Sequence, residues 1–343
     1  MAPRILVLGS LSIDFVSRVP HHPFPGETLT ASSFALCPGG KGANQATAIA
    51  KLSRPQTTPP VAAFSPVESA TVTMAGAVGN DAYGPMLLAN LASFGVDTSG
   101  VKVRDGMKSG VAIIIVDEPT GENRIVLSPE SNASVEEEEF ASGGAMSKVP
   151  GCGQDGGGKG AGSSKPDLLV MQLEIPLPTV LKALETAREE GIPVLFNPAP
   201  AVELPMEVYK GLAHLVVNET EAAILSGVDV QVLDTEEGLE KVARIFIERG
   251  CLQVIITLGG RGTYFMDCKG SKGLVPAEKA KVVDTTAAGD TFVGMYALDV
   301  VGAGGVCFDV ETAVRKANKA AKITVERPGA QASIPWRDEL PQQ

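Results

Sequence analysis

The segment DLLVMQLEIPLPTVLKALETAREEGIPVLFNPAP, Asp167–Pro200, contains the repeating unit that decides the fold. It begins with a continuous apolar run, which is typical of a strand buried on both faces. An amphipathic stretch over Pro178–Glu190 then predicts a helix, and IPVLFN predicts a second buried strand. This order predicts two parallel strands joined by a crossover helix.

The same alternation extends over most of the chain. Further apolar runs that we expect to form strands are RILVLG, TVTMAGAVG, HLVVNE and LQVIITLGG. Helical periodicity is present in six more segments: Ala43–Leu52, Tyr83–Phe94, Glu219–Leu225, Glu236–Arg249, Gly289–Val301 and Val310–Val325. We therefore expect one α/β domain over residues 1–343, with a central, mostly parallel sheet flanked by helices. Ligands of such sheets bind at the carboxyl ends of the strands.

Two regions interrupt the alternation with short strand-like runs and turn residues, 15–36 and 101–127. In the second, SGVAIIIVD and NRIVLS flank a turn and predict a hairpin. We expect the two regions to form a small β-sheet that covers the active site as a lid. Residues 53–69 are rich in proline and residues 143–165 are rich in glycine, so both are predicted to be flexible insertions without a chemical role.

The composition excludes several classes of protein. With 44% hydrophobic and 20% charged residues the chain is an ordinary globular protein, and its net charge of −11 argues against a nucleic-acid surface. Five widely spaced cysteines without a CxxC pair do not predict a zinc site and favour free thiols in a reducing compartment. No apolar run reaches the ~18 residues of a membrane span, and the N-terminal run is predicted to be a strand.

The segment DTTAAGDTFVG, Asp284–Gly294, places small residues and one acid at the start of a predicted helix. Small residues allow a tight turn and close approach to a ligand. We expect the amides of Ala287, Ala288 and Gly289 to form an anion hole, strengthened by the helix dipole. Asp290 can accept a proton there. These are the parts of phosphoryl transfer, although other reactions use them too.

Further polar residues follow predicted strands. Asp14 comes after the first strand and Glu174 ends MQLE, and either carboxylate can accept hydrogen bonds from sugar hydroxyls. CPGGKGANQATA differs from a P-loop, because Lys41 is followed by Gly42 and not by Ser or Thr. It offers bare backbone and Asn44 to a polyol. A capped turn explains this segment equally well, and Asp14 alone reads as a turn aspartate.

Two segments are compatible with a nucleotide site. NETE places Asn218 as a helix cap and Glu221 in the first turn, which dipole complementarity also explains. TLGGRGTYF, Thr257–Phe265, is a glycine-rich turn that would let a nucleotide approach closely. A plain hairpin turn remains an alternative for it.

GGKGANQA and DTTAAGDTFVG resemble the two signatures of the ribokinase family of carbohydrate kinases. The resemblance runs from Arg4 to about Arg337, and MQLE, FNPAPA, NETEA and GAQASIPWR indicate the ribokinase branch. It implies a three-layer ribokinase-like fold with a lid. It also implies ATP-dependent phosphorylation of the 5-hydroxyl of D-ribose, giving D-ribose 5-phosphate and ADP.

The resemblance also assigns residues. Asp290 would be the base, assisted by Ala287, Ala288 and Gly289. The sugar would be held by Asp290 with Ser12, Asp14, Gly40, Lys41, Gly42, Asn44 and Glu174. The nucleotide would be bordered by Gly289 together with Asn218, Glu221, Thr257, Leu258, Gly259, Gly260, Arg261, Gly262 and Asn318.

Three further properties are implied by the resemblance alone. Glu221 would be linked to Mg²⁺ and phosphate. An activating K⁺ would be bound by oxygen ligands from Asp284, Thr286, Thr324, Arg327, Gly329 and Ser333. Homodimers would form through the lid sheet, and the location would be the cytoplasm, with the nucleus as a second compartment.

The sequence also departs from the family pattern. SID, with Ser12, stands where some ribokinases have N-x-D, and SPESNAS leaves the role of Asn132 open. A kinase for another pentose, a ketohexose or a nucleoside therefore remains an alternative. A non-catalytic sugar sensor is a second alternative, although it would need no base. A nicotinamide dehydrogenase is disfavoured because LGSLSID lacks the GxGxxG turn.

Overall fold

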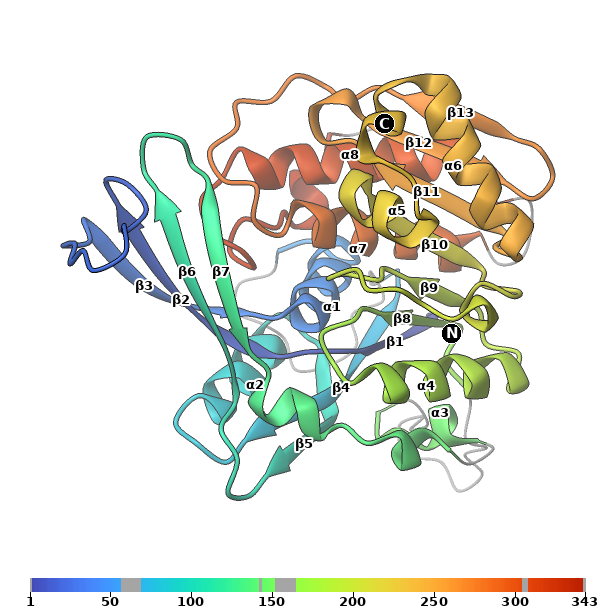
Figure 1. The fold of residues 1–343 in the computed structure, drawn as a ribbon. Helices are drawn as coiled ribbons and strands as arrows, with labels where there is room; N and C mark the ends of the chain where they lie inside the picture. The colour runs from blue at the N-terminus through green and yellow to red at the C-terminus, as the bar shows by residue number, and fades with distance from the viewer. Residues whose placement is uncertain (1, 57–68, 142–143, 152–164, 304–307, 342–343) are drawn as a thin grey trace.

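A computed structural model describes residues 2–56, 69–141, 144–151, 165–303 and 308–341. It has a large α/β body from which a small sheet projects at one end (Figure 1). Most of the two predicted insertions, 53–69 and 143–165, lies outside the described residues. Their predicted flexibility is therefore not tested.

The body contains a nine-stranded sheet within the described part of the chain. From β5 to β11 neighbouring strands are parallel, while β12 and β13 extend the edge as an antiparallel hairpin. The strands, in spatial order, are β5 (Asp97–Arg104), β4 (Thr71–Gly79), β1 (Arg4–Leu8), β8 (Leu168–Met171), β9 (Val194–Phe196), β10 (His214–Asn218), β11 (Gln253–Thr257), β12 (Thr263–Asp267) and β13 (Lys272–Val275). This confirms the predicted mostly parallel sheet.

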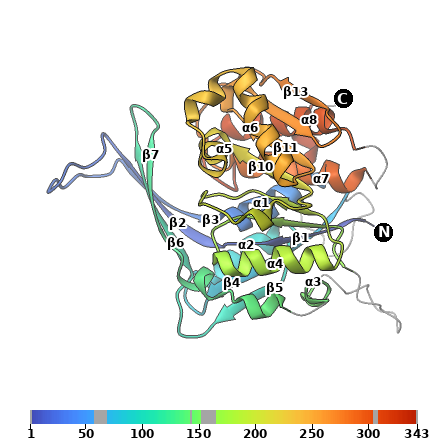
Figure 2. The same cartoon turned by 45° about the vertical axis from the view of Figure 1, so that its right-hand side comes forward.

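Helices cover both faces of this sheet (Figure 2). On β1, Ile5 and Val7 join one hydrophobic core while Leu6 and Leu8 join the other, as expected for a strand buried on both faces. One face carries α1 (Lys41–Leu52), α2 (Gly84–Ser93), α7 (Ala288–Gly302) and α8 (Val310–Val325). The other carries α3 (Ala145–Lys148), α4 (Leu177–Glu189), α5 (Glu219–Ser226) and α6 (Glu236–Arg249).

Short 3₁₀ helices lie in the connections. They are η1 (Glu130–Ser134), η2 (Glu137–Phe140), η3 (Met206–Val208), η4 (Val230–Asp234), η5 (Gly259–Arg261) and η6 (Arg337–Glu339). The acidic run Glu136–Glu139 thus begins a short helix, where its negative charge is favourable.

The projecting sheet is the predicted lid. Its strands, in spatial order, are β3 (Ser33–Gly39), β2 (Ser12–Val19), β6 (Gly110–Asp117) and β7 (Asn123–Ser128). The predicted hairpin forms two of its four strands, β6 and β7. The boundaries differ from those predicted. The second segment was expected to begin at residue 101, but residues 97–104 form β5 and pair with β4 in the body. Alternating residues suit an edge strand of either sheet, so the pattern alone does not choose between them.

The lid is joined to the body next to the carboxyl end of β1. Asn132, in η1, uses both polar atoms of its side chain on the backbone of Leu11: Oδ1 accepts from the amide at 3.0 Å and Nδ2 donates to the carbonyl at 2.8 Å. Asn132 is buried, so both bonds form away from water. This residue, whose role the sequence left open, connects the end of β7 to the start of β2.

Helices α1 and α7 approach each other closely because both carry small residues at the contact. A Cβ atom on Gly294 would lie 2.5 Å from the Cβ atom of Ala48 and 3.0 Å from the amide nitrogen of Ile49. The glycine therefore sets the distance between the two helices. Asn44 and Gln45 at the start of α1 are thereby brought to Asp290 in α7.

We predict that Gly294→Ala destabilises the protein, because the added methyl group forces α1 and α7 apart. The expected loss is about 1–3 kcal/mol, the usual cost of overpacking. Gly302→Ala is the matched control, since its Cβ meets nothing within 4 Å in the same helix. Denaturant unfolding of both variants checks this, and equal stabilities would contradict the proposed close contact.

Candidate active site

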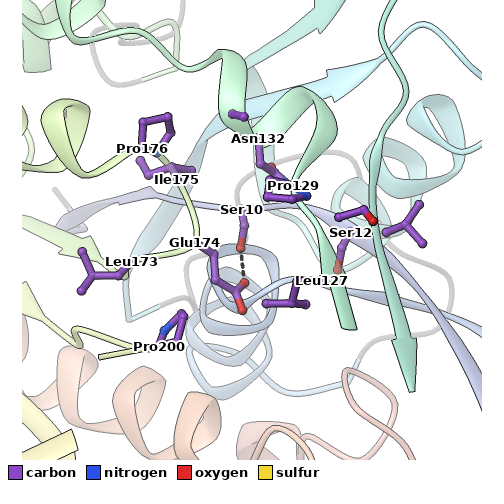
Figure 3. A pocket seen from close by; sticks show the side chains of 13 residues that line it. Ser10, Ser12, Leu127, Pro129, Asn132, Leu173, Glu174, Ile175, Pro176 and Pro200 are labelled. Carbon is purple, nitrogen blue, oxygen red and sulfur yellow. Dashed lines mark hydrogen bonds between the residues drawn. The ribbon is translucent and has the colours of Figure 1, made fainter. Parts of the chain in front are cut away.

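Glu174 lies at the carboxyl edge of the main sheet, between β1 and α1. Its Oε2 atom accepts a hydrogen bond from the Ser10 hydroxyl at 2.6 Å (Figure 3) and another from the Lys41 amide at 2.9 Å. Ser10 follows β1, and Lys41 begins α1. The carboxylate that the sequence placed at this edge is therefore anchored to both neighbouring elements.

A cavity of about 290 Å³ opens beside Glu174, between the lid and the body. This volume is close to the lower limit of about 300 Å³ for small-molecule pockets. Polar groups from Ser10, Ser12, Asn132 and Glu174 face it, and apolar side chains complete the wall (Figure 3). The apolar members come from the lid, from the segment that follows it and from the strand ends: Val111, Leu127, Pro129, Ala133, Leu173, Ile175, Pro176 and Pro200. Such a wall suits a small ligand with both hydroxyl groups and carbon surface.

Asp14 stands on lid strand β2 and is almost completely buried. Burial, the largest cause, and the charges of Glu174 and Asp290 together raise its pKa to about 6, against the lowering effect of the Ser12 hydroxyl. That hydroxyl donates to Asp14 Oδ1 at 2.8 Å. The Ser12 hydroxyl therefore orients the carboxylate and uses its own proton within the protein.

Lys41 is the cation among these acids. Burial lowers the pKa of Lys41, but the charges of Asp290, Glu174 and Glu221 outweigh that effect and raise it overall. The side chain therefore keeps its positive charge. Gly40, before it, has a φ of 90°, and a Cβ there would lie 2.9 Å from the Ser10 carbonyl oxygen. Gly42 is similarly constrained, because its Cβ would meet the Ser10 amide at 2.6 Å. The two glycines thus fit α1 against β1.

Asp290 lies in the first turn of α7, buried at the contact with α1. Its Oδ2 atom accepts from Asn44 Nδ2 at 3.1 Å, and its Oδ1 atom accepts from Gln45 Nε2 at 3.0 Å. Asn44 was predicted to hold the sugar, and the structure shows that it also holds the predicted base. Gln45 was missed, although it lies in the quoted GGKGANQA segment and follows Asn44 directly.

The turn before α7 is tight. Ala287 has a φ of 61°, a left-handed conformation that costs a residue with a side chain about 1–3 kcal/mol and is concentrated at functional sites. The Ala288 amide donates to the Thr285 carbonyl at 3.3 Å, so this member of the predicted anion hole has a partner within the turn. Gly289 is exposed, and a Cβ there would meet nothing within 4 Å. Space for an anion is therefore clearest at Gly289.

The predicted nucleotide residues begin at the next strand ends. Asn218 and Thr257 are register partners on β10 and β11, so they lie side by side. Asn218 caps α5 and forms a reciprocal pair with Glu221: each side chain accepts from the backbone amide of the other, at 2.8 and 2.9 Å. Burial and the charge of Asp290 raise the pKa of Glu221, against opposing effects of the Asn218 amide and Lys41.

The glycine-rich segment after β11 is a hairpin turn into β12, which was the alternative reading. Gly262 is required there, because its φ is 106° and a Cβ would lie 2.1 Å from the Val275 carbonyl oxygen. The amide of Leu258 closes the turn on the Gly262 carbonyl. Gly259 and Gly260 leave open space where a Cβ would stand, so a ligand can approach the backbone.

Two residues predicted at the nucleotide also have structural partners. Arg261 donates to the carbonyls of Leu233 and Asp234 and forms an ion pair with Glu219. Asn318, on α8, accepts from the Thr263 hydroxyl at 2.7 Å and donates to the Val275 carbonyl. Both therefore hold the hairpin in place.

The residues implied for K⁺ lie on two segments that meet near Asp284. The Asp284 carboxylate accepts from the Thr286 amide and hydroxyl and from the Gly329 amide, while the Val325 carbonyl accepts from the amides of Val283 and Asp284. Arg327 donates its amide to the Thr324 carbonyl, and Ser333 lies four residues beyond Gly329. Burial raises the pKa of Asp284, but the hydrogen bonds from Thr286 and Gly329 and the charge of Arg18 outweigh that effect and lower it.

Comparison with known proteins gives a consistent result over the whole chain. The model of the pfkB family of carbohydrate kinases matches residues 2–337. Ribokinase of Schizosaccharomyces pombe is 40% identical over 335 residues, which cover 97% of this chain and 95% of that protein.

Two solved structures show the same fold. Ribokinase from Thermotoga maritima aligns with a TM-score of 0.76 at 33% identity, covering 99% of this chain and 98% of that one. Arabidopsis thaliana ribokinase, complexed with ribose and ATP, aligns with a TM-score of 0.79 at 25% identity, covering 98% and 97%. This chain, with its ribokinase-like α/β body and separate lid sheet, belongs to the pfkB family of carbohydrate kinases.

Proposed function

We propose that this protein is a ribokinase, which transfers the γ-phosphoryl group of ATP to the 5-hydroxyl of D-ribose, giving D-ribose 5-phosphate and ADP. The observation that carries the proposal is the buried Asp290 carboxylate at the start of α7, held by Asn44 and Gln45. The full-length similarity to ribokinases and the structure of a relative with ribose and ATP support the choice of substrates.

The residues divide the work of the reaction. Asp14 and Glu174 accept hydrogen bonds from sugar hydroxyls and orient the ring, and Asp290 takes the proton of the attacking 5-hydroxyl. The first turn of α7, with Gly289 open to the site, stabilises the negative charge of the phosphoryl group. Lys41 adds a positive charge that interacts with Asp290, Glu174 and Glu221. Asn218 and Thr257 border the nucleotide at the strand ends.

Mg²⁺ is part of the proposal, and the residues present fit it. Mg²⁺ usually keeps several water ligands and is bound by one or two carboxylates together with substrate phosphates. Glu221 offers such a carboxylate, with Oε2 fixed by the Asn218 amide and facing the charges of Lys41 and Asp290. When bound, the ion would screen the phosphate charges.

K⁺ is the proposed activator, and the ligand set also fits. The proposed ligands are oxygen atoms, which suit a hard cation: the Asp284 carboxylate, the carbonyls of Thr286, Thr324, Arg327 and Gly329, and an oxygen of Ser333. The lowered pKa of Asp284 keeps its carboxylate charged, and Thr286 lies directly before the strained Ala287. A bound ion would hold this turn in place.

The lid offers a surface for the proposed homodimer. Leu36, Phe15, Ile113 and Val126 are register partners across its four strands and so share one face. Of these, Leu36, Ile113 and Val126 are 47%, 49% and 63% exposed. We propose that a second copy of the chain covers this apolar row.

The proposed location is the cytoplasm and the nucleus, and it stays a prediction from the family resemblance. Within the described residues, no helix is long and apolar enough to span a bilayer.

We predict that Asp290→Asn abolishes most turnover, because the amide cannot accept the proton. General bases contribute about 10²–10⁴-fold, so kcat should fall by at least about a hundredfold. The assay follows ADP and ribose 5-phosphate formation, and calorimetry should find ribose affinity largely retained. A variant with most of the wild-type kcat would remove Asp290 as the base.

We predict that replacing K⁺ with tetramethylammonium lowers kcat, because a large organic cation cannot approach the Asp284 carboxylate and the neighbouring carbonyl oxygens as closely as K⁺ can. Ionic strength is kept constant in the two buffers. Equal rates in both buffers would count against the cation site.

We predict that Val126→Lys yields monomers, because a charge in the apolar row opposes burial against a second lid. Val103→Lys on β5 is the matched control, since Val103 is 51% exposed outside the lid. Sedimentation velocity measures the masses. A dimeric Val126→Lys protein would place the interface elsewhere.

A further inference from the structure

Two chains of side-chain amides converge on the carboxylate of Asp290. In the first, Gln172 Nε2 donates to Gln45 Oε1 at 2.6 Å, and Gln45 Nε2 donates to Asp290 Oδ1 at 3.0 Å. In the second, Asn90 donates to Gln331 at 2.6 Å, Gln331 to Asn44 at 3.1 Å, and Asn44 to Asp290 Oδ2 at 3.1 Å. In both chains, each side-chain amide donates through its NH₂ group to the next residue in the direction of Asp290.

The first chain has a fixed direction. The Gln45 carbonyl faces the amino group of Gln172, and its own amino group is shared between Asp290 and Asn197 Oδ1 at 3.0 Å. Asn197 in turn donates to the Val216 carbonyl at 2.9 Å, which turns its oxygen toward Gln45. A reversed Gln45 amide would set oxygen against oxygen at Asp290 and Asn197, and nitrogen against nitrogen at Gln172.

These amides lie deep inside the protein. Gln45 and Gln172 are 0% exposed, so water does not compete for their hydrogen bonds. A buried polar group without its partner is costly, so the observed direction of the Gln45 amide, which satisfies both its oxygen and its nitrogen, is preferred over its reversal. The donors are also neutral. They can therefore orient the carboxylate without the full charge that a lysine or arginine would place against a proton acceptor.

We propose that Gln45 and Gln172 are positioning residues for the phosphoryl-transfer reaction. Gln45 fixes the carboxylate plane of Asp290, so that a free lone pair is directed at the sugar hydroxyl. Gln172 sets the direction of the Gln45 amide and touches neither the base nor the substrate. This inference rests on the proposed role of Asp290 as the base.

Two variants test the relay. Gln45→Met keeps a similar volume and removes the donor to Asp290. Gln172→Glu is nearly isosteric. Its ionised carboxylate places an oxygen against the Gln45 carbonyl oxygen, and this favours the reversed orientation of the Gln45 amide. In its protonated form the same carboxyl can donate to Gln45, as the native amide does.

The expected result is a loss confined to kcat. Both variants should lower kcat by about tenfold or more, since small misplacements of a catalytic group cost up to about a hundredfold. KM for ATP should change less than about twofold. The kcat of Gln172→Glu, relative to wild type, should fall as pH rises through the titration of the introduced carboxyl. The double variant should lose little more than Gln45→Met alone.

Gln231→Glu is the control for the added charge, because Gln231 is exposed in η4 away from the relay. Melting temperatures of all variants are measured in parallel. The inference is overturned if Gln45→Met and Gln172→Glu keep kcat within about twofold of wild type, or if kcat falls only in proportion to folded protein. Asp290→Asn separates the two hypotheses: activity in that variant removes the base itself, whereas an inactive Asp290→Asn beside fully active relay variants removes the relay alone.

Discussion

The close approach of α1 to α7 is the constraint on which the site depends. Gly294 against Ala48 leaves no room for another methyl group, and this contact puts the first turns of both helices within hydrogen-bonding distance. One helix supplies the proton acceptor and the other supplies its donors. The site is therefore a product of core packing, because a change of a few tenths of an ångström at the glycine would act directly on the Asp290 hydrogen bonds.

Charge is the second organising factor. The site holds four acids, Asp14, Glu174, Glu221 and Asp290, and the charge of Lys41 interacts with the last three. The pKa of Asp14 is raised to about 6, chiefly by burial. Folding brings these acids together against their mutual repulsion. A site with such an excess of negative charge favours a ligand that brings hydroxyl donors, and it favours cations with the phosphates.

The sequence was sufficient for the architecture, and it singled out Asp14, Lys41, Glu174 and Asp290, which the structure brings close together. Continuous apolar runs predict the buried strands, and all seven predicted helices begin and end within two residues of the observed bounds. The largest difference is at α1, which begins at Lys41, two residues before the predicted start. The lid boundary at residue 101 was wrong, because alternation does not reveal which sheet an edge strand joins.

Other features needed three-dimensional contacts. Gln45, Gln172 and Gln331 lie up to 286 residues apart, and nothing in their local sequence shows that their hydrogen bonds lead, directly or through a neighbouring amide, to the carboxylate of Asp290. Asn132 likewise acts on Leu11, 121 residues away. Hydrogen bonds between distant segments carry no local pattern. For the same reason, the sequence did not show that Arg261 bonds to Leu233 of η4 or that Asn318 bonds to Thr263 of β12.

The position of Ser12 and Asp14 on β2 has a mechanical consequence. These residues belong to the lid sheet, whereas Asn44 and Asp290 belong to the body. A sugar bound by both sets of residues would connect the lid to the body. Its own binding energy would then set the angle between lid and body, and a sugar lacking one hydroxyl would leave that angle less well defined. Substrate selection and closure would in that way be a single event.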